Sequence, residues 1–300
     1  MGYKWKTMIE IPEDLRSLDR AEISRISESN ARVRLKEYDP FIHKGNRGHL
    51  ALIAGSPGMI GASMLSAAAA SRSGLGKLTV CVPENAILPI HLFLPEVMVK
   101  VQEDDIDLGH FSAVAIGPGL GTSNQSEAIL KKTISFGLPM VLDADALNLL
   151  SKDKNLLVKL PKDAILTPHL MEWQRIFGNS KNDKDRITTS ILFCKKLNIN
   201  ILIKGHISVL VNAEGNIFYN GTGNPGMAKG GSGDVLTGII GSLLAQGYSA
   251  TDAGILGMYL HGLSGDLASH DLGEDAMTST DQISYISAAF KSLRNSRANP

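Results

Sequence analysis

The sequence predicts an α/β fold in which a mostly parallel central sheet is covered by helices on both faces. Short apolar runs of strand length alternate with helical stretches along most of the chain, a pattern that is typical of this class. Polar or glycine-rich turns follow several of these runs directly, at the place where ligands bind beyond the carboxyl ends of parallel strands. The chain has 300 residues, of which 43% are hydrophobic, and is therefore long enough to bury one large core.

The first forty residues differ from the rest of the chain. Residues 12–37 carry a loose apolar stripe among many charges and predict a polar helix. We therefore expect an N-terminal helical extension, residues 1–40, before a main α/β domain, residues 41–300.

In the main domain, predicted strands alternate with predicted helices along the sequence. Strands are expected over residues 50–54, 77–82, 97–101, 113–116, 139–142 and 164–167, and helices over 62–73 and 126–136. After a charged helix over 183–196, strands over 199–204, 208–212 and 216–220 predict a hairpin at the edge of the sheet, with Ala213-Glu-Gly215 as its tight connection. Helices over 249–267 and 281–293 complete the pattern.

The stretch from Asn224 to Leu244 is the one around which the chain is organised. Gly230, Gly231 and Gly233 allow backbone N–H groups to converge on an anion, and apolar residues at helical spacing follow at once. This pattern predicts a phosphate site at the N-terminus of a buried helix. Asp234 stands at the junction, where its carboxylate is either the N-cap of the helix or a base that accepts a proton from an attacking hydroxyl.

Five other polar stretches come directly after predicted strands and are expected to share one edge of the sheet with Asp234. They are Gly55-Ser-Pro-Gly58, Gly117-Pro-Gly-Leu-Gly121, Asp143-Ala-Asp145, Thr167-Pro-His169 and Lys204-Gly-His-Ile-Ser208. Each has a simpler explanation as well. The glycines suit tight turns, the two aspartates suit helix caps, His169 suits a hydrogen-bonded histidine after a proline turn, and Lys204 suits an edge-strand cation.

Composition narrows the class of partner. Lys plus Arg and Asp plus Glu are both 30, so the balance predicts a small-molecule ligand and no nucleic acid. Cys81 and Cys194 lie among apolar neighbours, which indicates buried free thiols in a reducing compartment. We expect a cytoplasmic protein without a secretory signal. Residues 51–71 carry no charge, but Pro57 and many small residues favour a strand, a turn and a helix over a membrane span.

Two further patterns carry little weight. Gly221-Thr-Gly-Asn-Pro-Gly226 matches G-x-G-x-x-G, but no acidic residue follows at the distance that a dinucleotide site requires, and the P-loop pattern is absent from the sequence. A metal site could be formed by His261, Asp266 and His270, but their spacing places them on different sides of a helix. We therefore expect no metal held by protein ligands alone.

An ordered series of motifs resembles the ribokinase-like superfamily and, within it, the ADP- or ATP-dependent NAD(P)H-hydrate dehydratases. The resemblance covers roughly residues 44–267 and rests on residues 44–49, 54–56, 73–76, 117–121, 142–147, 166–169, 204–205 and 230–236. Ser208 and Ser232 stand where the family pattern usually has threonine, and both keep the hydroxyl.

The resemblance implies an activity and assigns residues to it. The family is thought to phosphorylate the hydroxyl of hydrated NADH or NADPH and to let phosphate leave. The resemblance implies that Asp234 is the catalytic base and that an anion hole is formed by Gly230, Gly231, Ser232 and Gly233. The hydrated cofactor would contact Ala62, Gly119, His169 and Asp234, and ADP or ATP with Mg²⁺ would lie over Lys204, Gly205, His206, Ile207, Ser208 and Gly233.

The same resemblance implies further partners, and two alternative functions remain open. Many bacterial relatives carry an epimerase domain before the dehydratase, whereas only about forty residues precede the first motif here. We therefore expect either a separate epimerase or spontaneous epimerisation. The family favours a homotetramer. The alternatives are a hydroxymethylpyrimidine- or thiazole-type kinase, in which phosphate stays on the product, and a catalytically silent nucleotide-binding sensor.

Overall fold

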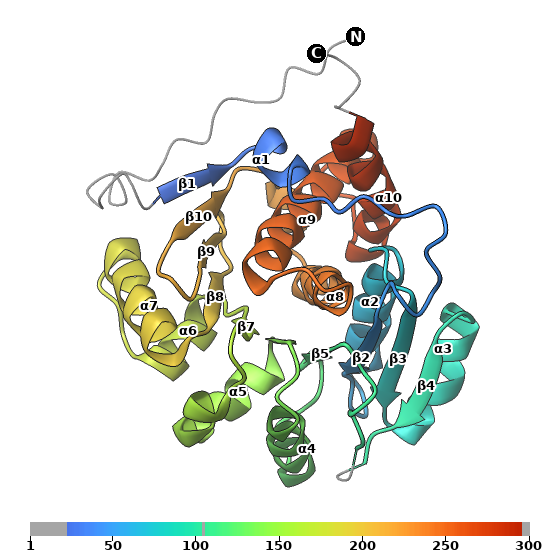
Figure 1. Cartoon of the computed structure of the whole chain (residues 1–300), viewed down its shortest axis with the longest axis horizontal. Coiled ribbons are helices and arrows are strands. Elements are labelled where there is room, and N and C mark those ends of the chain that lie inside the picture. The colour runs from blue at the N-terminus through green and yellow to red at the C-terminus, as the bar shows by residue number, and fades with distance from the viewer. Residues whose placement is uncertain (1–22, 104–105, 296–300) are drawn as a thin grey trace.

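The computed structural model describes residues 23–103 and 106–295. In these residues one sheet of ten strands runs through the molecule in the order β1-β10-β9-β8-β7-β6-β5-β2-β3-β4 (Figure 1). All neighbouring strands are parallel except β9, which is antiparallel to both β8 and β10. The strands are β1 (Ile23–Ile26), β2 (His49–Ile53), β3 (Lys77–Val82), β4 (Met98–Val101), β5 (Ala113–Ile116), β6 (Met140–Leu142), β7 (Ile165–Leu166), β8 (Asn200–Ile203), β9 (Val209–Val211) and β10 (Ile217–Asn220).

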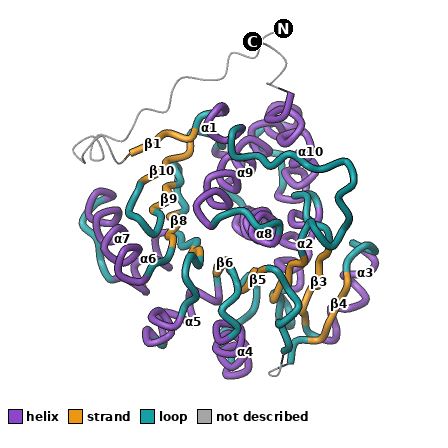
Figure 2. The backbone as a smooth tube through the Cα atoms, in the orientation of Figure 1, coloured by secondary structure: helices purple, strands orange, loops and turns teal. Residues whose placement is uncertain are grey.

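Helices lie on both faces of the sheet, as Figure 2 shows. One face is covered by α2 (Ile60–Ser71), α8 (Ser232–Ala245), α9 (Ala250–Leu272) and α10 (Ser279–Asn295). The other face is covered by α4 (Asn124–Ser135), α5 (Asp145–Lys152), α6 (Leu170–Phe177) and α7 (Asp183–Leu197). The short helix α1 (Glu28–Arg32) follows β1, and α3 (Ile87–Phe93) precedes β4.

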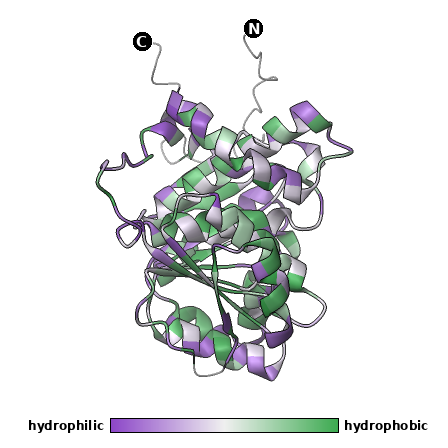
Figure 3. Ribbon diagram, turned by 90° about the vertical axis from the view of Figure 1, so that its right-hand side faces the viewer, coloured by the Kyte–Doolittle hydropathy of each residue, from purple (hydrophilic) through white to green (hydrophobic). Residues whose placement is uncertain are grey.

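The strands supply the core on both sides because their side chains alternate. In β2, Leu50 and Leu52 belong to the apolar cluster under α2 and α8, whereas Ala51 and Ile53 belong to the cluster under α4 and α5. All four side chains are fully buried. Figure 3 shows the hydrophobic residues gathered on the sheet and on the helices against it. The predicted α/β class is thereby confirmed, and so are the buried positions of Cys81 and Cys194 as free thiols.

The N-terminal prediction is wrong where the structure describes it. Residues 12–37 were expected to form one polar helix, but β1 pairs in parallel with β10, and α1 is a single short turn capped by Ser27. Ile26, Ala31 and Leu35 are buried in the main core. Residues 1–22 lie outside the described part, so an extension over them stays a prediction.

The hairpin β9–β10 forms as predicted, but it does not lie at the edge. Asn212 N and Asn216 O close its turn at 3.0 Å. β1 then adds a parallel strand outside β10. The edges of the described sheet are therefore β1 and β4.

Helices α2 and α8 pack with their backbones unusually close together. A Cβ atom at Gly238 on α8 would lie 2.2 Å from the carbonyl oxygen of Ser66 and 2.9 Å from the Cβ of Ala69, both on α2. Alanine-rich α2 thus leaves room for α8 but none for an additional methyl group.

We predict that Gly238→Ala destabilises the protein by about 2 kcal/mol. The overpacking costs about 3 kcal/mol, and the better helix propensity of alanine offsets about 1 kcal/mol of this. Urea unfolding should show a lower midpoint than for the parent. Gly61→Ala is the matched control, because a Cβ at Gly61 in α2 meets nothing within 4 Å. Equal midpoints for the two variants would contradict the prediction.

Candidate functional site

The loops that follow the parallel strands converge at one edge of the sheet, as the sequence predicts. Backbone and side-chain hydrogen bonds join successive loops, namely Gly55 N to Pro118 O at 2.8 Å, Gly121 N to Asp145 Oδ2 at 2.8 Å and Lys204 N to Pro168 O at 2.8 Å. A Cβ at Gly117 would lie 1.8 Å from the carbonyl oxygen of Asp143, so only glycine permits this approach. The five polar stretches therefore form a single rim.

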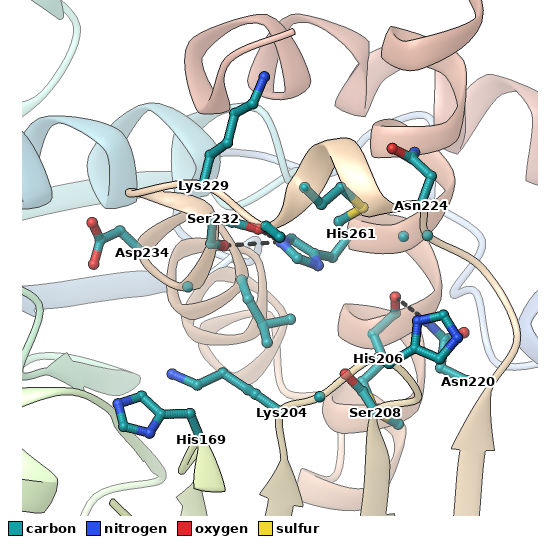
Figure 4. A pocket seen from close by; sticks show the side chains of 18 of the residues that line it. His169, Lys204, His206, Ser208, Asn220, Asn224, Lys229, Ser232, Asp234 and His261 are labelled. Atoms are coloured by element: carbon teal, nitrogen blue, oxygen red, sulfur yellow. Dashed lines mark hydrogen bonds between the residues drawn. The ribbon is translucent and has the colours of Figure 1, made fainter. Parts of the chain in front are cut away.

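A pocket of about 850 Å³ opens beside this rim. In the view of Figure 4, His169, Lys204 and Asp234 lie on one side of it, and His206, Asn220 and Asn224 lie on the other. The sequence-predicted residues that line it are His169, Lys204, Gly205, His206, Ser208, Gly230, Ser232, Gly233 and Asp234. The remaining four, Ala62, Gly119, Ile207 and Gly231, do not line it. Ile207 packs on the core. A Cβ at Gly231 would lie 2.5 Å from Leu65 Cδ1, and a Cβ at Gly119 would lie 3.0 Å from the Cβ of Ala62.

The N-terminus of α8 forms one wall of the pocket. We call residues 228–233 the anion loop. Gly231 is the N-cap of α8, with a φ of 92° that favours glycine. A Cβ at Gly230 would meet nothing within 4 Å, so this side of the loop is open. The first N–H groups of a helix have no intrahelical acceptor, and Gly233 and Asp234 supply two of them to the positive end of α8.

Asp234 lies in the first turn of α8 and lines the pocket. Its backbone is fixed because Ser66 Oγ donates to the Asp234 carbonyl at 3.0 Å. Burial raises the pKa of its carboxyl group to about 7, and the charge of Asp143 adds to the rise while Lys204 opposes it. Because the N-cap is Gly231 and not Asp234, the capping explanation of this aspartate is wrong.

Lys204 is the centre of a charged cluster next to Asp234. Its ammonium lies 2.5 Å from Asp143 Oδ1 and 3.9 Å from Glu172 Oε2. Burial lowers the pKa of Lys204, but the two carboxylates raise it by more, so the group stays charged. The explanation of Lys204 as an edge-strand cation is therefore wrong, because β8 lies inside the sheet.

The carboxyl groups of this cluster have further partners. Asp143 is 1% exposed and accepts a hydrogen bond from Thr237 Oγ1 at 2.8 Å, so it is not a helix cap. Burial raises the pKa of Glu172 above its ordinary value, although the charge of Lys204 opposes the rise. Sequence reasoning missed Glu172 and Thr237. The spacing of His169 and Glu172 was the available signal, since an acidic residue three positions after an N-cap is typical of a capping box.

His169 is the N-cap of α6, and its tautomer follows from that position. Its Nδ1 accepts hydrogen bonds from the backbone N–H groups of Met171 at 3.1 Å and Glu172 at 3.3 Å. In the neutral ring the proton therefore lies on Nε2, which is 3.4 Å from Glu172 Oε1. The simpler explanation, a hydrogen-bonded histidine, is correct, and the ring lines the pocket as well.

His261 on α9 lines the pocket and holds the backbone of the anion loop. Its Nε2 lies 2.9 Å from the carbonyl oxygen of Ser232, to which it donates, and 3.2 Å from Ser232 Oγ. Burial lowers its pKa to about 4, so the ring is neutral near pH 7. Asp266 accepts from Gly223 N, and His270 contacts Asp271. Within the described residues, no three His, Cys, Asp or Glu side chains are grouped so as to hold a metal ion.

Comparisons with known proteins show which sequences this chain resembles. A family model described as NAD(P)H-hydrate dehydratase matches residues 50–288. A bifunctional NAD(P)H-hydrate repair enzyme of Moorella thermoacetica is 33% identical over 95% of this chain and 57% of its own length. An ADP-dependent (S)-NAD(P)H-hydrate dehydratase of Neisseria meningitidis is 36% identical over 77% of this chain and 80% of its own length. The chain thus spans about half the length of the bifunctional relatives.

Solved structures of similar proteins have the same fold as this chain. The ADP/ATP-dependent NAD(P)H-hydrate dehydratase of Bacillus subtilis, crystallised with ATP/Mg²⁺, has a TM-score of 0.82, with 32% identity over 89% of this chain and 97% of that chain. A ribokinase-like superfamily protein of Enterococcus faecalis has a TM-score of 0.81, with 30% identity over 92% of this chain and 98% of that chain. The predicted ribokinase-like fold is therefore confirmed.

Proposed function

Because this chain belongs to the NAD(P)H-hydrate dehydratase family, we propose that it returns the S-epimer of hydrated NADH and NADPH to the reduced cofactor at the expense of ADP or ATP. One observation carries the proposal. Asp234, a carboxyl group with a pKa of about 7, stands in the first turn of α8 beside an open anion loop. A base with that pKa is suited to accept a proton near neutral pH.

The first proposed step is phosphoryl transfer. The hydroxyl oxygen of the hydrate attacks the terminal phosphorus of the nucleotide, a new O–P bond forms, and the P–O bond to the rest of the nucleotide breaks. Asp234 takes the hydroxyl proton. The N–H groups of the anion loop and the positive end of α8 stabilise the negative charge on the transferring group.

The second step is elimination. The C–O bond to the new phosphate breaks, the neighbouring ring carbon loses a proton, and the ring double bond returns. The products are the reduced cofactor, inorganic phosphate and the shortened nucleotide. Phosphorylation is needed because hydroxide is a poor leaving group.

The predicted site residues, both those that line the pocket and Ile207, Ala62 and Gly119 outside its lining, divide between the two ligands in this proposal. Lys204, Gly205, His206, Ile207 and Ser208 follow β8 and would hold the nucleotide with Gly233. His169, Ala62 and Gly119 would hold the hydrated cofactor next to Asp234. Support comes from the hydrogen bond from Lys204 N to Pro168 O, which holds the loop after β8 beside the loop after β7.

Magnesium fits this site as a partner of the nucleotide. The described residues contain no group of three metal-ligating side chains, and Asp143 is already paired with Lys204. The donor set therefore suits an ion held mainly by phosphate oxygens and water. When bound, Mg²⁺ supplies positive charge to the phosphates.

Three wider expectations stay predictions: a separate epimerase, a homotetramer and a cytoplasmic location. No described helix is long and apolar enough to cross a membrane.

We predict that the purified protein, with Mg²⁺ and either ADP or ATP, restores NADH absorbance from hydrated NADH, and that omitting the nucleotide abolishes the recovery. Running both nucleotides in parallel identifies the donor. A stable phosphorylated product without NADH would favour the small-molecule kinase instead. Nucleotide binding with neither product would favour the silent sensor.

A further inference from the structure

Lys229 in the anion loop has an unusual set of partners. Its ammonium donates hydrogen bonds to three main-chain carbonyl oxygens, those of Glu274 at 3.1 Å, Asp275 at 2.6 Å and Met277 at 2.6 Å. All three belong to residues 273–278, the α9–α10 turn. An ammonium group has three protons, so this turn accepts all of them.

Lys229 lines the pocket, but its side chain turns away from the site residues. Figure 4 shows it pointing away from His169, Lys204 and Asp234. Because its three protons are taken by the turn, we expect its charge to act on the site through the backbone of the anion loop. Residues next to the α9–α10 turn and next to the anion loop are close together as well. Ser279 Oγ, at the start of α10, donates to the carbonyl of Gly230 at 2.9 Å, and a Cβ at Gly226 would lie 2.8 Å from Glu274 Cα.

The backbone at Lys229 is part of the loop that would face the phosphate. Lys229 N donates to Met227 O at 2.8 Å, and Ser232 N donates to Lys229 O at 3.4 Å. These bonds tie the backbone of Lys229 to Met227 and Ser232. Gly230 follows Lys229 in the chain and Gly233 follows Ser232, so the position of Lys229 affects the directions of their N–H groups. A shift of the lysine would therefore move the donors of the anion hole.

We propose that Lys229 is a positioning residue whose ammonium acts as an internal monovalent cation, bonding the anion loop to the α9–α10 turn. The inference rests on the proposed function, since it concerns the anion hole of that reaction. Converging main-chain carbonyls are also the ligands that bind K⁺. Truncating the lysine would leave these carbonyls in place for a free cation of similar size.

The test compares two truncations of the same lysine. In choline chloride, Lys229→Ala should lower kcat for NADH recovery by about 10- to 100-fold, because misplaced donors stabilise the transition state poorly, and should change KM little. KCl or NH₄Cl at equal ionic strength should restore the rate. Lys229→Met fills the space without a charge and should not be restored. Lys154→Ala, which removes an exposed lysine on another face, should match the parent.

Each opposite result overturns the proposal. One such result is a kcat of Lys229→Ala in choline chloride equal to that of the parent. A second is a loss of kcat in Lys229→Ala that neither K⁺ nor NH₄⁺ restores. A third is that these ions restore the kcat of Lys229→Met as fully as that of Lys229→Ala. The parent provides a test that does not depend on how the variants fold. Its rate should be the same in choline chloride and in KCl, and a requirement for K⁺ in the parent would contradict an internal cation.

Hydrogen exchange separates this inference from the proposed function. In choline chloride, amides of residues 225–233 should exchange faster in Lys229→Ala than in the parent, and KCl should slow them again. This readout needs no turnover. A parent without dehydratase activity would refute the proposed function, whereas unchanged exchange in the variant would refute the role of Lys229.

Discussion

Replacing Asp234 by asparagine lowers kcat for NADH recovery by about 10²–10⁴-fold, the usual contribution of a general base. Asparagine has nearly the same shape and cannot accept the hydroxyl proton. The anion loop does not depend on this side chain, because Gly231 caps α8. Calorimetry should therefore show nucleotide binding close to that of the parent. A variant that keeps more than about a tenth of the parent rate would rule out Asp234 as the base.

The pH dependence of kcat/KM in the parent tests the same role of Asp234 independently. Only the carboxylate form of Asp234 can act as a base, so kcat/KM should fall as the pH drops below about 7. Asp145 raises the pKa of Asp234, more weakly than burial and Asp143 do. Asp145→Asn should therefore move the midpoint of the profile to lower pH. A midpoint that stays in place would contradict the electrostatic origin that we assign to this part of the shift.

Asp234 should also make the protein less stable as the pH rises. Its folded pKa of about 7 lies above its ordinary value of 3.8, so between these values the folded state binds more protons than the unfolded state. The free energy of unfolding therefore falls through this window. Asp234→Asn should lack that fall and should have a higher Tm than the parent at pH 8, where the parent carboxylate is charged and partly buried.

Replacing Lys204 by methionine lowers the free energy of unfolding by about 3–5 kcal/mol. Asp143 is 1% exposed, and the change would leave its carboxylate buried with Thr237 as its remaining hydrogen-bond donor. Urea unfolding measures the loss.

A double-variant cycle separates this pairing from ligand binding. Asp143→Asn together with Lys204→Met removes both charges, so it should recover most of the stability that Lys204→Met alone loses. The double variant should fold and still bind ADP or ATP weakly, since we place Lys204 at the nucleotide. A double variant as unstable as the single one would show that the ion pair is not the cause of the loss.

The sequence predicts the rim of the site better than its interior. Glycine and proline turns after apolar runs mark the ends of parallel strands, and topology alone brings those ends together. The pairing of Lys204 with Asp143 depends on the neighbouring positions of β6, β7 and β8, which no local pattern encodes. His261 on α9 reaches Ser232 at the start of α8, a contact that the spacing of His261 to Asp266 and His270 does not encode.

The N-terminal error has a different physical cause. Ile23-Ser-Arg-Ile26 is too short and too polar to favour a strand by itself, and the scattered apolar residues around it fit a helix equally well. The strand exists because β10 supplies its hydrogen-bond partners, as the pairing of Ile23 with Ile217 shows. A partner so distant in the sequence leaves no local signal.

That pairing also dictates the order in which the molecule can be completed. On the ribosome, residues 23–26 emerge before Ile217–Asn220, and most of the described chain lies between them. Closing such a long loop delays the contact, because loop-closure entropy must be overcome before the pairing contributes any energy. The nascent chain therefore carries β1 without its partner until β10 has been made.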